Sequence, residues 1–227
     1  MKKLFSLLLA ATMTFSLTLP ALADHYTYSE PEKSTMMPRS TPETHGMSSQ
    51  YILDLLDAFD YADAEVHNIL MAIDGEVVFE GHYAPYTALD PHIMFSGTKI
   101  FTNAAVGVAV TEGYLHLDDY VYDVLKDYVT QDVSELQSKV QLKHLLTMTG
   151  VDRFMSGSEL RPLTTSWIEH ILTEPIVHEP GTYYLYSSGN TMLSSAMVTV
   201  ATGKTCLELL NTTGFCEELG IKNFTWD

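Results

Sequence analysis

The chain has 227 residues, 46% of them hydrophobic, and a formal net charge of −17 at neutral pH. That length and apolar content are enough to bury a sizeable core, whereas the negative charge repels nucleic acid and anionic lipid. We therefore expect a globular protein without a nucleic-acid partner. The charge by itself names no substrate.

The first 23 residues have the pattern of a signal peptide. A basic start, Met1-Lys2-Lys3, precedes an apolar stretch over residues 4–19 and a small-x-small site at Ala21-Leu22-Ala23. The stretch is too short and too rich in Ser and Thr for a spanning helix, and no cysteine follows the site to carry a lipid. We expect cleavage after Ala23 and a secreted or extracytoplasmic protein with no stable membrane anchor.

The next signals are a linker, a helix and a hairpin. Residues 24–47 are polar, contain three prolines and show no periodicity, which predicts a linker, or an arm over the surface, before a domain over residues 48–227. Ser48 or Ser49 can cap a helix whose apolar residues form one stripe: Ile52, Leu55, Leu56 and Phe59. Two apolar runs around Asp74-Gly75 then predict a pair of antiparallel strands, over residues 69–73 and 77–79.

From residue 96 onward the periodicity is mostly helical. We expect helices over residues 96–111, 140–148, 167–172 and 190–200, with Gly113 and Gly203 following the first and the last. Residues 151–163 contain Gly, Ser, Pro and charges, and predict a surface loop. Glu179-Pro180-Gly181 predicts a turn.

Ser96-Gly97-Thr98-Lys99 places a serine and a lysine three residues apart at the start of an apolar helix. Side chains at this spacing share one helix face, so the Lys99 amine can reach the Ser96 hydroxyl. A buried lysine loses much of its preference for charge and can take a serine's proton, which suits acyl transfer. The alternative is structural: Ser96 caps the helix and Lys99 is a solvated residue of its first turn.

Cys206 and Cys216 are the two cysteines. In an oxidising compartment they could form a disulfide, but their apolar helical surroundings also suit free, buried thiols. No group of cysteines and histidines has the spacing of a metal site, and we expect no metal or other cofactor.

Three motifs in order carry a resemblance to a known family. They are Ser96 to Lys99, His144-Leu145-Leu146-Thr147-Met148-Thr149-Gly150, and Pro180-Gly181 through Tyr186-Ser187-Ser188. Together with Thr41-Pro42-Glu43, they resemble the serine beta-lactamase-related and penicillin-binding-protein-like hydrolases, in the branch of class C enzymes, D-peptidases and esterases. The resemblance covers residues 41–227. It implies an α+β (α/β) fold of the beta-lactamase/transpeptidase type, a helical domain with an antiparallel sheet.

The resemblance also implies catalytic roles. Ser96 would be the nucleophile, Lys99 its proton acceptor, and Tyr186 an aid to proton transfer, matching the tyrosine of the family's Tyr-x-Asn motif. The Ser96 N–H, at a helix start, could donate to an oxyanion. The alternative for Tyr186 is a packing aromatic in a tyrosine-rich turn.

Ser188 stands where the family usually has asparagine. A second register, Ser188-Gly189-Asn190, mimics the Ser-x-Asn motif of other penicillin-binding proteins, so Ser188 and Asn190 are candidate substrate-binding residues. A serine at this point is more typical of esterase and amide-hydrolase relatives than of true beta-lactamases. The expected substrate is therefore a small molecule or peptide with an ester or amide bond, with D-amino-acid peptides and beta-lactams as further candidates.

The family's third motif, Lys-Thr-Gly or His-x-Gly on a sheet strand, is not found after Tyr186. The chain is thus expected to match the N-terminal two-thirds of such an enzyme, with the C-terminal sheet strands missing. Two hypotheses follow: an exported serine hydrolase working through an acyl-enzyme, or a non-catalytic remnant or ligand-binding module of the same family.

Overall fold

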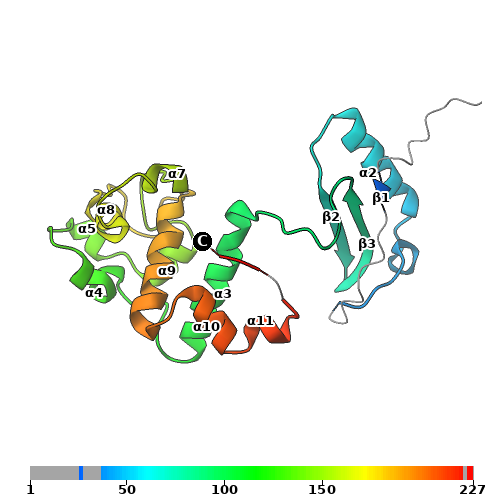
Figure 1. Ribbon diagram of the computed structural model, residues 1–227. Helices are drawn as coiled ribbons and strands as arrows, with labels where there is room; N and C mark the ends of the chain where they lie inside the picture. The colour runs from blue at the N-terminus through cyan, green and yellow to red at the C-terminus, as the bar shows by residue number, and fades with distance from the viewer. Residues whose placement is uncertain (1–25, 28–36, 222–223, 227) are drawn as a thin grey trace, which may run out of the picture. The chain divides into compact units, whose positions relative to one another are not determined.

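The computed structural model describes residues 26–27, 37–221 and 224–226. The predicted signal peptide over residues 1–23 lies outside them. The chain forms two compact units that divide between His92 and Ile93 (Figure 1). Among the described residues, no helix is long and apolar enough to cross a membrane.

The first unit holds an antiparallel sheet. Within the described residues its strands are β1 (Tyr26–Thr27), β2 (Asn68–Ile73) and β3 (Glu76–Tyr83), in the order β1-β3-β2. Asp74 and Gly75 both have positive φ, 49° and 82°, as the tight turn between twisted strands requires. The predicted hairpin is confirmed.

A helix and an extended segment accompany this sheet. α2 (Ser49–Tyr61) begins after Ser48, whose hydroxyl accepts from the Gln50 N–H, and it buries Ile52 and Leu56 as predicted. The 3-10 turn η2 (Pro42–His45) precedes it. The end of the predicted linker pairs with β3: the Val77 N–H donates to the Pro38 carbonyl at 2.8 Å, and the Ser40 N–H donates to the Val77 carbonyl at 3.1 Å.

The second unit is helical. In the described residues its α-helices are α3 (Thr98–Thr111), α4 (Val121–Leu125), α5 (Glu135–Ser138), α6 (Leu142–Leu146), α7 (Gly157–Leu160), α8 (Trp167–Thr173), α9 (Ser188–Thr202), α10 (Cys206–Thr212) and α11 (Phe215–Glu218). Two 3-10 turns, η3 (Phe95–Gly97) and η4 (Lys126–Tyr128), adjoin α3 and α4.

Helix α9, orange in Figure 1, is central to this unit and contacts α3, α4, α6 and α8. Ala105 and Ala109 of α3 are completely buried, as are Leu193 and Met197 of α9. Small alanines let helix backbones approach closely, so the larger residues of α9 fill the core. Gly203 ends α9 in the left-handed region at φ 70°, which confirms the predicted stop.

Residues 151–163 are not a surface loop: they contain α7, and three of their apolar residues are buried, namely Val151, Met155 and Leu160, although Phe154 is exposed. Most of the residues between them are polar, so the segment lacks a regular apolar pattern in the sequence. Cys206 and Cys216 are both buried free thiols, which agrees with the second of the two interpretations above.

Candidate active site

Ser96 lies in the 3-10 turn immediately before α3. Phe95, one residue earlier, has φ 44°, which side-chain-bearing residues rarely adopt, and the Gly97 N–H donates to the Met94 carbonyl at 2.8 Å. The N-cap of α3 is Gly97, and Ser96 makes no capping hydrogen bond. The structural alternative for Ser96 is therefore wrong, and its hydroxyl is left exposed on the helical unit.

Lys99 follows one helical turn later and reaches back to the serine. Its Nζ donates to Ser96 Oγ at 3.2 Å. The side chain is only half-buried, so the fully buried lysine that the sequence argument assumed is not found. The apolar composition of α3 suggested a surface with no room for a charge, but the first turn of the helix is open to solvent.

Tyr186 comes from the turn before α9 and lies beside both residues. Lys99 Nζ is 5.2 Å from the centroid of the Tyr186 ring, within reach of a cation–π contact. Hydrogen bonding to Ser96, then to Lys99, together with the charge of Lys99, lowers the pKa of Tyr186 below its ordinary value of 10.0. The three side chains therefore form one polar cluster.

Backbone hydrogen bonds between distant segments place Tyr186 there. The Leu185 N–H donates to the Met148 carbonyl at 2.9 Å, and the Ser188 N–H donates to the Met155 carbonyl at 2.9 Å. Hydrogen bonds on both sides of Tyr186 thus attach it to residues 148–155, a segment that begins within the second motif. The sequence placed these motifs in order but did not indicate which atoms join them.

His144 supports the same arrangement from within the second motif. Its Nδ1 accepts from the Gln141 N–H at 3.1 Å, and burial lowers the pKa of His144, which favours the neutral ring that this bond needs. Gly181 sits against the ring: its φ is 88°, and an added Cβ would lie 3.2 Å from two His144 ring atoms. The Gly181 N–H also donates to the Thr149 carbonyl at 3.1 Å.

Ser187 is a residue that the sequence argument missed. Ser187 is completely buried, and its hydroxyl caps α9 by accepting from the Gly189 N–H at 3.2 Å. The same oxygen accepts from the Met155 N–H at 3.0 Å, outside the helix. A serine directly before an apolar helical run is the signal that could have identified it.

The two predicted substrate-binding residues, Ser188 and Asn190, differ in how deeply they are buried. Ser188 is half-buried at the first turn of α9. Asn190 is completely buried beside Gly150, and its amide atoms have no hydrogen-bond partner within the part of the chain that the structure describes. Asn190 is therefore inside the unit, whereas Ser96 is on its surface. Contact of either residue with substrate stays a prediction.

Comparison with known proteins places this cluster in a family. The sequence model described as Beta-lactamase matches residues 67–227. The chain belongs to the beta-lactamase family. The matched range includes the three motifs and all of the helical unit, and the predicted family resemblance is confirmed.

Solved structures show the same beta-lactamase/transpeptidase-like fold. A protein designated 6-aminohexanoate-dimer hydrolase from Bacillus anthracis is 19% identical with a TM-score of 0.55, over 70% of this chain and 45% of its own. One designated beta-lactamase from Bacteroides dorei DSM 17855 is 20% identical with a TM-score of 0.60, over 74% and 51%. A beta-lactamase/D-alanine carboxypeptidase from Pseudomonas syringae is 15% identical with a TM-score of 0.57, over 74% and 49%. This family member spans about half the length of the structures it matches.

Proposed function

We propose that the chain carries the acylation site of an exported serine hydrolase, which cleaves an ester or amide through an acyl-enzyme on Ser96. The observation that carries this proposal is the contact of Lys99 and Tyr186 with one serine hydroxyl, at 3.2 Å for Lys99 Nζ. Membership of the beta-lactamase family supports the same chemistry.

The proposed first step moves a proton from Ser96 Oγ as the hydroxyl attacks the substrate carbonyl. Lys99 and Tyr186 form a pair beside the serine, in which hydrogen bonding to Ser96 and to Lys99, and then the charge of Lys99, lower the pKa of Tyr186. One member of the pair takes the serine proton, and the pair later returns a proton to the leaving group. Water then releases the acyl group and restores Ser96.

Ser188 supports an ester or simple amide as substrate. A serine hydroxyl donates and accepts through one oxygen, whereas the asparagine usual at this point offers a separate NH2 donor group and carbonyl acceptor. The proposed substrate is a small molecule or a peptide, and beta-lactams and D-amino-acid peptides are the comparison substrates for the assay.

Labelling by a serine-reactive fluorophosphonate, in the full chain, tests the nucleophile. We expect labelling of the wild type, none in Ser96→Ala, and wild-type labelling in Ser158→Ala, which removes another exposed serine of the same unit. Lys99→Met and Tyr186→Phe should each slow labelling by about 10²- to 10⁴-fold. Unchanged labelling of Ser96→Ala would reject the proposal.

Turnover separates the two hypotheses for this chain. A hydrolase releases product from a p-nitrophenyl ester continuously. A ligand-binding member of the family would be labelled once at Ser96 and then show no further release.

Export is a separate part of the proposal, supported by the pattern over residues 1–23. N-terminal sequencing of the protein recovered outside the cytoplasm should begin at Asp24. Recovery with Met1 intact would contradict export by cleavage.

A further inference from the structure

The rings of His67 and His92 are in contact in the first unit, beside the start of β2. His67 immediately precedes β2, and His92 ends the segment 84–92 that follows β3; their Nδ1 and Nε2 atoms are 2.8 Å apart. The Tyr86 ring stacks on His67 with centroids 3.9 Å apart and meets His92 edge-on at 5.0 Å. Three rings thus attach segment 84–92 to the start of β2.

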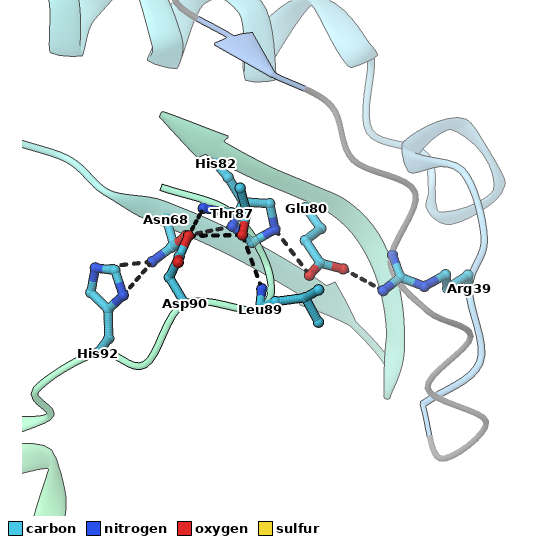
Figure 2. Close-up of polar contacts among 8 residues, drawn as sticks. All are labelled: Arg39, Asn68, Glu80, His82, Thr87, Leu89, Asp90 and His92. Atoms are coloured by element: carbon cyan, nitrogen blue, oxygen red, sulfur yellow. Dashed lines mark hydrogen bonds and ion pairs between the residues drawn. The ribbon is translucent and has the colours of Figure 1, made fainter. Parts of the chain in front are cut away.

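Only one hydrogen atom can lie between the two facing nitrogens, His67 Nδ1 and His92 Nε2. Of two ring nitrogens 2.8 Å apart, one must donate and the other accept. Asn68 Nδ2, a donor, lies 3.3 Å from both ring nitrogens of His92 (Figure 2). Because His92 Nε2 already faces His67, its Nδ1 is the acceptor for this amide, and the Nε2–H then donates to His67 Nδ1. The remaining His67 N–H, on Nε2, points to Glu65 Oε1 at 3.3 Å.

A polar chain on the other side orients Asn68. Its Oδ1 accepts from His82 Nδ1, and His82 Nε2 lies 3.4 Å from Glu80 Oε1. Glu80 forms an ion pair with Arg39, so the chain of contacts runs from Arg39 across the sheet to His92 (Figure 2). The Asn68 amide is therefore held by a partner on each side, and it presents its N–H group to His92.

We propose that His67 and His92 form a proton-sensitive latch, which holds segment 84–92 on β2 at neutral pH and releases it when both rings are protonated. With two imidazolium rings, an N–H donor would face another N–H donor across 2.8 Å, and two positive charges would be in contact. Neither ring would then accept a hydrogen bond from the other or from Asn68. The released segment leads directly, along the chain, to the turn that bears Ser96.

Other ionisable groups face this contact. Glu65 lies beside His67, and Asp90, on the same segment as His92, interacts electrostatically with His92 and with His82 of β3. Asp90 accepts hydrogen bonds from Thr87 N and Oγ1, and these bonds, with the charges of His92 and His82, lower the pKa of Asp90. Asp90 therefore stays ionised over the range where histidines gain charge, and its protonation does not cause the release.

Hydrogen–deuterium exchange of the full chain tests the latch. Four amides of the segment donate hydrogen bonds, to Tyr83 at the end of β3 or to Thr87 and Asp90 within the segment: Tyr86, Thr87, Leu89 and Asp90. Their protection reports the order of the segment, which the ring contacts with His67 are proposed to maintain. After correction for intrinsic exchange rates, we expect the peptide over residues 84–92 to lose about tenfold in protection between about pH 7.5 and about pH 5. His67→Gln and His92→Gln each place a side chain that cannot be protonated on one side of the contact, so both variants should lose this pH dependence.

A matched control is His116→Gln, which removes an exposed histidine from the helical unit and should keep the tenfold change. Wild-type protection that does not depend on pH would overturn the proposal. So would a wild-type response in both glutamine variants, because the titrating group would then lie elsewhere in the polar chain. Both substituted side chains are partly exposed, and unchanged exchange over β2 and β3 at neutral pH verifies that the variants fold.

Discussion

The Ser187 hydroxyl accepts a hydrogen bond from the Met155 backbone N–H at 3.0 Å, inside the helical unit. The same oxygen caps α9 by accepting from the Gly189 N–H. One completely buried side chain therefore joins the start of α9 to a segment more than thirty residues earlier. Because Tyr186 is the preceding residue, its position depends on this link.

We predict that Ser187→Ala lowers the free energy of unfolding by about 1–3 kcal/mol, since two backbone N–H groups lose their acceptor in a buried place. Urea denaturation measures the change. Ser187→Thr keeps the hydroxyl and should cost less than the alanine variant. An alanine variant as stable as the wild type would contradict the role given to this oxygen.

Gly181 and Gly107 form a matched pair for substitution by alanine. Gly181→Ala should lower the free energy of unfolding by about 1–2 kcal/mol, because φ is 88° and the new Cβ would press on the His144 ring. Gly107 is in the middle of α3, and open space lies where a Cβ would be added. Gly107→Ala should therefore raise the free energy of unfolding by about 0.5–1 kcal/mol. Calorimetry compares the two, and equal effects would refute the close approach of Gly181 to His144.

Tyr186 should ionise at a lower pH than an ordinary tyrosine. The difference between the ultraviolet titrations of wild type and Tyr186→Phe isolates its phenolate among the thirteen tyrosines. Lys99→Met should move this midpoint upward, because the lysine hydrogen bond and charge both lower the pKa of Tyr186. A midpoint that is the same with and without Lys99 would contradict the contact.

The sign of the linked stability follows from the same shift. The folded protein favours the phenolate, so Tyr186 contributes stability above the ordinary pKa of 10.0. The contribution is lost as the pH falls through the lower pKa of the folded state. Unfolding experiments at alkaline pH should therefore show a smaller loss of stability in wild type than in Tyr186→Phe.

The two cysteines should behave as protected thiols. Both are buried and free, and burial raises the pKa of Cys206, so little reactive thiolate is available. We expect no fast reaction with a thiol reagent in the native protein and two reacting thiols per chain after denaturation without reductant. No reactive thiol after denaturation would instead mean a disulfide.

Local signals predicted most of the secondary structure correctly. The Asp74-Gly75 turn, the Ser48 cap and the Gly203 stop each depend on backbone preferences within a few residues, so the hairpin, α2 and the end of α9 follow from neighbours in sequence. The segment 151–163 shows where this fails. Its burial depends on α8 and α9 supplying the other walls of the core, which no local pattern reveals.

For the candidate site, too, one part follows from local sequence and another part only from tertiary packing. The sequence by itself determined that Lys99 could reach Ser96, because a three-residue spacing on a helix places two side chains on one face. Only the tertiary structure decided that Tyr186 joins them and that Lys99 stays half-exposed. The physical reason is that the Met148 and Met155 carbonyls accept backbone hydrogen bonds from the residues around Tyr186, and such bonds form only when segments distant in sequence pack together.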